Sequence, residues 1–151
     1  MSKTAIPTFQ TEPLAMHPAL GVCIGEYHYN IIGGAGGLTR FGVHIEVLRP
    51  RAKSSLHHWH QTEDEMVDIL SGEVVLVEED ETILCKGDVA CWPVAVPVGN
   101  HLENRSGADA SYLTVGTPNK QDVIHYPDHE LVTYKDCYDR RYTHSDGRPV
   151  E

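Results

Sequence analysis

The chain has 151 residues, of which 40% are hydrophobic, and a formal net charge of -10. This length favours one domain with a sizeable core, and the excess of acidic residues argues against nucleic acid and anionic membranes as partners. No apolar run approaches the roughly 20 residues of a membrane span, and the first residues lack the pattern of a secretory signal. We therefore expect a cytoplasmic protein.

The elements expected in chain order are mostly short strands. Residues 1–37 carry several prolines and the glycine cluster 33–37, which predicts an irregular arm and a mobile loop. Apolar and polar residues then alternate through 41–48, and Pro50 ends that strand. Turn signals about eight to twelve residues apart predict an all-β sandwich or barrel. The further strands expected from this pattern are 55–60, 65–70, 73–78, 82–85, 89–93, 100–104 and 110–115.

The tail and the cysteines carry weaker signals. The tail is polar, and we expect one further strand at 122–126 or 131–134 and a loose stretch in the last ten residues. The four cysteines form no CxxC pair, so we expect free thiols in a reducing compartment rather than disulfides or a zinc site. These cysteines are Cys23, Cys85, Cys91 and Cys137.

The segment His58-Trp59-His60, followed by Glu65, carries the strongest chemical signal. Residues two apart on a strand lie on the same face, roughly 6.6 Å apart, so both imidazoles can lean toward one ion while Trp59 faces away. Glu65 returns on the next strand and can supply a third ligand. Three N and O donors suit a divalent transition metal with open coordination positions. The competing interpretation is a solvated strand edge with an accidental histidine cluster.

Two stretches of the chain resemble the two motifs of the cupin superfamily. The first family motif is a glycine, five residues, His-x-His, three or four residues, Glu, six residues and Gly. Here His58, His60, Glu65 and Gly72 match it, and Ala52 replaces the leading glycine. The strings 37–43, 104–106 and 125–128 are similar to those of small single-domain bacterial cupins. The resemblance covers roughly residues 40–117.

The second motif departs from the family pattern. Ala95 replaces its glycine, and Val98 stands at the position of the family histidine. Counting back from Asn104 puts Asn100 at the ligand position, with His101 next to it on the opposite face of a regular strand. A bulge would turn His101 inward, because a bulge shifts parity by one residue. We favour His101 as the fourth ligand, since imidazole binds transition metals better than an amide; Asn100 remains the alternative.

The resemblance implies a cupin jelly-roll (double-stranded β-helix) barrel of two antiparallel sheets. It divides the chain into an arm at 1–37, a barrel core at 38–117 and a C-terminal extension at 118–151. It implies one divalent metal ion (Zn, Mn, Fe or Ni) held by His58, His60, Glu65 and His101, with a small-molecule ligand in the barrel. It also implies a homodimer.

The functions that the family performs leave alternatives open. One is a metal-dependent enzyme acting on a small polar molecule, either a sugar or sugar-phosphate isomerase or epimerase, or an oxygen-dependent dioxygenase. Another is a non-catalytic binding or sensing protein that uses the same cavity, and a third is a structural cupin with a vestigial site. Because one fold supports many chemistries, the sequence does not choose the substrate.

Overall fold

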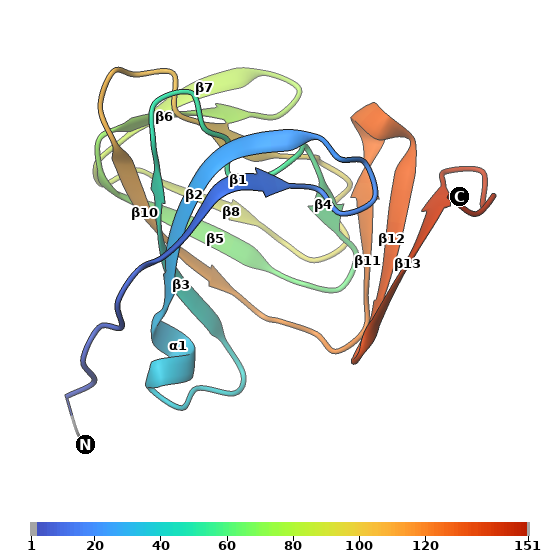
Figure 1. The fold of residues 1–151 in the computed structure, drawn as a ribbon, viewed down its shortest axis with the longest axis horizontal. Helices are drawn as coiled ribbons and strands as arrows, with labels where there is room; N and C mark the ends of the chain where they lie inside the picture. Colours follow the sequence, from blue (N-terminus) through green and yellow to red (C-terminus); the bar gives the residue numbers. More distant parts are fainter. Residues whose placement is uncertain (1–2, 151) are drawn as a thin grey trace.

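The protein was analysed as a computed structural model, which describes residues 3–150. Antiparallel strands dominate and form three sheets (Figure 1). The six-stranded sheet has the order β1-β2-β3-β10-β5-β8, the three-stranded sheet β7-β6-β9, and the four-stranded sheet β13-β12-β11-β4. The strands are β1 (Gln10–Met16), β2 (Cys23–Ile31), β3 (Gly42–Leu48), β4 (Trp59–His60), β5 (Glu65–Ser71), β6 (Glu73–Val77), β7 (Glu81–Cys85), β8 (Val89–Trp92), β9 (His101–Glu103), β10 (Ala110–Gly116), β11 (Asp122–Tyr126), β12 (Leu131–Asp136) and β13 (Asp139–His144).

The six-stranded and three-stranded sheets enclose the main core. Inward residues of β3, β5 and β10 meet inward residues of β6, β7 and β9, as the period-two alternation requires. Tyr112, Leu48 and Ile69 are almost fully buried there. The other members of this core are Ala52, Val67, Val74, Leu76, Leu84, Leu102 and Ala110. The prediction of an all-β jelly roll is confirmed.

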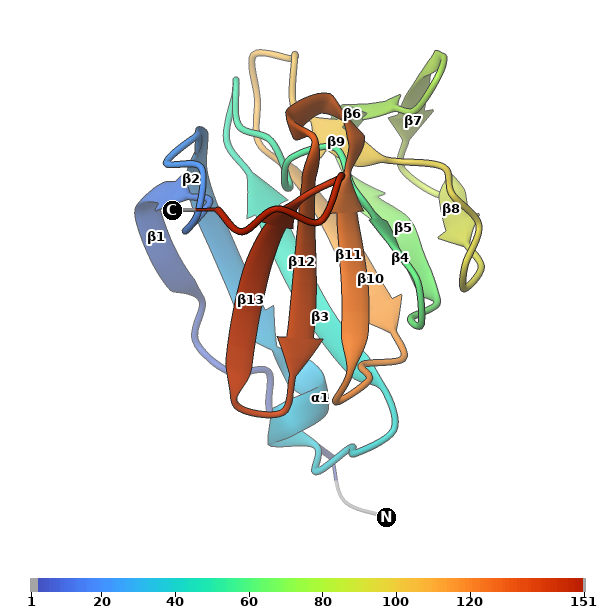
Figure 2. The ribbon, with the colours of Figure 1, turned by 90° about the vertical axis from the view of Figure 1, so that its right-hand side faces the viewer.

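The C-terminal sheet lies across one side of the barrel, where β11, β12 and β13 run side by side (Figure 2). Its inner face packs on a second apolar cluster built from Leu56, Ile124, Tyr126 and Leu131. Strand β4 joins this sheet by pairing with β11, so that His60 lies opposite Ile124 and Trp59 opposite His125. The C-terminal extension is therefore in direct contact with the His-x-His segment.

Residues 3–37 contain more regular structure than the sequence predicts. Strands β1 and β2 pair with each other, and β2 also pairs with β3, which places them at one edge of the six-stranded sheet. The glycine cluster contributes to a single helical turn, α1 (Ile32–Ala35). Prolines around and inside β1 masked the strand pattern: Pro13 lies where the pairing with β2 is irregular, and an edge strand tolerates such a residue. A 3-10 turn, η1 (Pro127–His129), joins β11 to β12.

The cysteines and the end of the chain can also be compared with the sequence predictions. All four cysteines are free, and all four are exposed. The last ten residues are not loose throughout, because β13 continues to His144. Among residues 3–150, no helix has the length and apolar character needed to cross a membrane.

Candidate metal centre and active site

The structure brings together three of the four predicted ligands. His58 and His60 come from the segment at β4, and Glu65 begins β5. The Nε2 atoms of the two histidines are 3.1 Å apart, and a Glu65 oxygen is 4.0 Å from Nε2 of His60. Their ligand atoms all lie within 4.8 Å of one another. Trp59 faces the other way and stacks on His125 with ring centroids 4.0 Å apart, as strand parity predicts.

Each of the two histidines is held in place by a hydrogen bond at Nδ1, the ring nitrogen that points away from the cluster. Nδ1 of His58 lies 2.8 Å from the carbonyl oxygen of Leu56. Nδ1 of His60 lies 2.6 Å from a carboxylate oxygen of Asp122. A carbonyl and a carboxylate can only accept hydrogen bonds, so each imidazole carries its proton on Nδ1 and donates the hydrogen bond from there. Both Nε2 atoms are therefore left as acceptors that face each other.

Two nitrogen lone pairs that face each other at 3.1 Å repel, and a proton or a metal ion between them relieves this repulsion. Burial lowers the pKa of His58 to about 4, and the neighbouring His60 contributes to the same effect. Burial also acts against the charge on His60, but the hydrogen bond to Asp122 and the carboxylate of Glu65 together raise its pKa. The site thus favours one proton or one cation, not two protons. Two imidazoles and a carboxylate fit a divalent transition metal at about 2.0–2.2 Å from each donor.

Asp122 on β11 supports the site from the C-terminal sheet. Its side chain is fully buried, and its second oxygen accepts from the backbone N–H of Thr62 at 2.9 Å and from the Thr62 hydroxyl at 2.8 Å. Burial opposes ionisation, but the hydrogen bonds from His60 and Thr62 lower its pKa. A carboxylate that orients a ligating histidine is the usual outer partner of such a metal site.

Glu63 forms a second possible group with His60 and Asp122. However, the Nδ1 atom of His60 that faces Glu63 at 3.7 Å is already committed to Asp122. Glu63 instead accepts from the Lys135 ammonium at 2.6 Å. We interpret this second group as the support of the first and not as a separate ion site.

The structure does not turn His101 toward His58, His60 and Glu65. The pairing of β9 with β6 runs without a register shift, so Leu102 faces the core and His101 faces the opposite side. Nε2 of His101 bonds to Glu103 at 2.9 Å, and its ring packs against His57. Asn100, the alternative, is buried and pairs through its backbone with His58. It lines the same hollow as His58 and Glu65.

Two connected hollows adjoin the histidines, of about 160 and 100 Å³. Glu65 and Thr114 line both hollows, His60 lines the larger one, and His58 lines the smaller one. The smaller one also contains Glu46, which is only 7% exposed and accepts a hydrogen bond from the hydroxyl of Tyr112. A buried carboxylate beside a candidate metal is a typical proton-transfer group.

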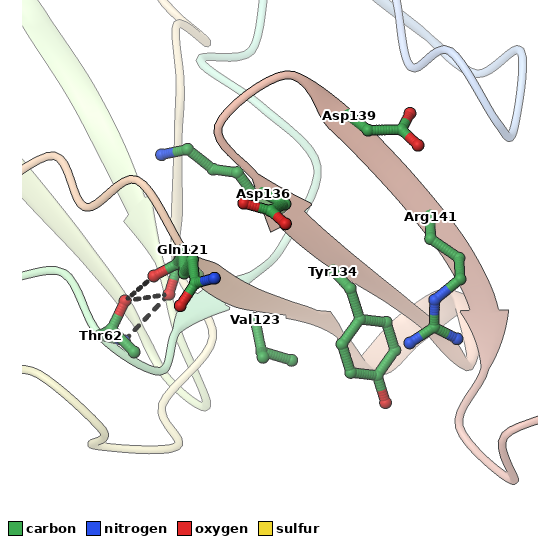
Figure 3. Close-up of a pocket in the computed structure, with 9 residues that line it drawn as sticks. Thr62, Gln121, Val123, Tyr134, Asp136, Asp139 and Arg141 are labelled. Carbon is green, nitrogen blue, oxygen red and sulfur yellow. Dashed lines mark hydrogen bonds between the residues drawn. The ribbon is translucent and has the colours of Figure 1, made fainter.

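A separate groove of about 470 Å³ lies on the face of the C-terminal sheet that points away from Ile124 (Figure 3). Its charges are mixed: Arg141 lies 4.1 Å above the ring of Tyr134, and Asp136 and Asp139 lie at the hairpin end. His58, His60 and Glu65 do not line it. The groove therefore contains none of the three clustered ligands, although Asp122, which supports His60, is part of its lining.

The fold and the site were compared with known proteins. A sugar phosphate isomerase of the cupin superfamily from Silicibacter pomeroyi is 32% identical, with a TM-score of 0.91, over 99% of this chain and 97% of that one. The chain belongs to the cupin superfamily. No protein-family model and no curated protein matches the sequence.

Two other solved structures resemble this cupin. A protein from Acidithiobacillus ferrooxidans, provisionally named a sugar phosphate isomerase, is 25% identical with a TM-score of 0.78, over 83% of this chain and 81% of its own. The polyketide cyclase RemF from Streptomyces resistomycificus is 16% identical with a TM-score of 0.60, over 78% and 79%. At that identity RemF supports the fold alone.

Sequence reasoning missed three polar residues of this cupin's site. Glu46 shares strand parity with His44 and Leu48, so its inward direction was visible, but nothing marked it as functional. Tyr112 is buried with its hydroxyl on Glu46, and no local pattern links these two residues. Asp122 lies 62 positions from His60 in the sequence, and no local pattern links the two.

Proposed function

We propose that this cupin is a metal-dependent isomerase of a small sugar-like carbonyl compound. The observation that carries the proposal is the pair of Nε2 acceptors, on His58 and His60, 3.1 Å apart and both anchored through Nδ1. This arrangement opens onto a hollow that holds the buried carboxylate of Glu46. The similarity to a cupin named as a sugar phosphate isomerase supports the same class of reaction.

His58, His60 and Glu65 would hold the metal, which we expect to be Zn, Mn, Fe or Ni. When bound, such an ion supplies Lewis acidity that polarises a substrate carbonyl. Asn100 lies beside these residues and can hydrogen-bond a substrate hydroxyl or a ligand water. The Leu56 carbonyl and Asp122 keep both imidazoles in the tautomer that presents Nε2 to the ion.

Glu46 is the candidate base of the reaction. Aldose–ketose interconversion moves the hydroxyl proton to the carbonyl oxygen, and it also requires a second proton to leave the carbon next to the carbonyl and to return to the former carbonyl carbon. The Glu46 carboxylate can carry that proton between the two carbons. Burial, followed by the charge of Glu46, raises the pKa of Tyr112 well above its usual value, so Tyr112 stays protonated and holds the carboxylate in place. The backbone of β3 fixes the position of Glu46.

The test is proton exchange measured by NMR in D2O with metal-loaded protein and free or phosphorylated aldoses. We expect deuterium to enter at the carbon next to the carbonyl. Replacing Glu46 with Gln keeps the shape and the bond to Tyr112 but removes the base, so exchange should fall by about 10²–10⁴-fold while metal affinity is kept. Metal-dependent oxygen consumption without exchange would instead indicate a dioxygenase. Ligand binding without either reaction would indicate a binding protein.

A further inference from the structure

The walls of the two hollows are rich in carboxylates. Glu46 and Glu65 line the smaller hollow, while Glu63, Asp64 and Glu65 line the larger one. Among the described residues that line either hollow, none is a lysine or an arginine. Phosphate sites in proteins depend on Arg, Lys or helix N-termini, which supply charge-assisted hydrogen bonds.

The lysine that reaches this wall from β12, Lys135, is already paired with a carboxylate. Lys135 reaches Glu63 from β12 with its ammonium 2.6 Å from the carboxylate, and it lines the outer groove, not the hollows. A divalent ion on His58 and His60 would be balanced by the carboxylates of Glu65 and Glu46. A phosphate group, with a charge of about -1.5 to -2 at pH 7, would then stand uncompensated beside these carboxylates.

The polar groups inside the hollows suit hydroxyl groups instead. The Thr114 side chain lies on the wall shared by both hollows, and its buried hydroxyl has no hydrogen-bond partner among the described residues. A buried hydroxyl without a partner is costly, so a ligand that bonds it gains affinity. Tyr112 and Asn100 add further buried donors and acceptors. Volumes of about 160 and 100 Å³ are small beside the roughly 300–1,000 Å³ of drug-sized sites.

We propose that the hollows bind a small uncharged sugar in preference to its phosphate ester, and that the Thr114 hydroxyl bonds one of the sugar's hydroxyl groups. The preference follows from the carboxylate-rich lining, which contains no lysine or arginine among its described residues, and the position of the bond follows from the Thr114 hydroxyl, which has no partner among the described residues. This inference rests on the proposed isomerase function for its choice of a sugar. It differs from the substrate class named for the Silicibacter pomeroyi protein.

The experiment is calorimetric titration of the Mn-loaded protein with D-ribose, D-xylose and D-ribose 5-phosphate. We expect a free pentose to bind at least tenfold more tightly than the phosphate. Thr114→Val keeps the shape but removes the hydroxyl, and it should weaken pentose binding about five- to tenfold with manganese affinity unchanged. Thr143→Val is the matched control, because that hydroxyl is also buried and unpartnered but lies on β13, away from both hollows.

The outcomes separate this inference from the proposed function. Equal or tighter binding of the phosphate overturns the inference and leaves the isomerase proposal standing. Pentose binding without proton exchange supports the inference and overturns the isomerase proposal. Failure of every sugar to bind, or equal effects of Thr114→Val and Thr143→Val, overturns the inference.

Discussion

Replacing Asp122 with Asn should weaken metal binding without touching a ligand. One Asp122 oxygen faces the N–H of Thr62, which can only donate, at 2.9 Å. The amide oxygen of Asn will therefore occupy that position, and its NH2 group will face Nδ1 of His60. That forces Nδ1 to accept and moves the ring proton to Nε2, the atom that should bind the metal. Loss of such an outer partner typically costs 10–100-fold in affinity, or about 1.4–2.7 kcal/mol.

The assay is competition of the purified variant with a metal chelator, with circular dichroism to establish that it is folded. Asp136→Asn is the matched control, because it removes the same charge from an exposed position on the adjacent strand β12. We expect this control to bind metal like the wild type. A folded Asp122→Asn protein with wild-type affinity would refute the argument that Asp122 sets the tautomer of His60.

Four further outcomes are expected. The double variant His58→Ala/His60→Ala should be purified without stoichiometric metal by elemental analysis, and equal content in wild type and variant would exclude the site. Asn100→Ala should weaken metal or sugar binding more than His101→Ala in the same titrations, because His101 faces Glu103; the reverse order would restore His101 as a ligand. The folded pKa of His58, about 4, lies below its value of 6.5 in the unfolded chain. As the pH falls from 6.5 to 4, His58 therefore becomes protonated in the unfolded chain but stays neutral in the folded protein. Urea unfolding of the metal-free protein should show that its free energy of unfolding falls by up to about 3 kcal/mol over this range. Ile69→Ala should lower the free energy of unfolding by about 2–5 kcal/mol, because the side chain is 1% exposed in the main core; a change below 1 kcal/mol would contradict that packing.

The strands of the barrel could be predicted because each has one face in the core. The alternation in 41–48 and the turns at Gly72 and Gly87 define β3, β5, β6, β7 and β8 within one or two residues. Gly72 marks its turn for a steric reason: its φ is +76°, and a Cβ there would lie 2.7 Å from the carbonyl oxygen of Asp109. Strands β1 and β2 lack this clear alternation, because β1 is almost wholly exposed and β2 is half-buried along most of its length.

The site could be predicted only where its residues are close in sequence. His58, His60 and Glu65 follow from strand parity and one tight turn, and the structure places them together. His101 was expected at the site because a bulge was assumed, whereas the register of β9 is regular. Local spacing cannot establish such a register, because a shift of one residue exchanges the two faces of a strand.

The two histidines differ in what supports them, and this difference links the C-terminal sheet to function. The support of His58 is the backbone carbonyl of Leu56, which no substitution can remove. The support of His60 is the side chain of Asp122, which arrives on β11 and is itself held by Thr62. Changes in the C-terminal sheet should therefore act on His60 and leave the tautomer of His58 unchanged. A chain that ended at residue 117 would keep the three clustered ligands but lose Asp122 and the strand that pairs with β4. By this reasoning the unit that holds the metal extends beyond the barrel strands to include β11.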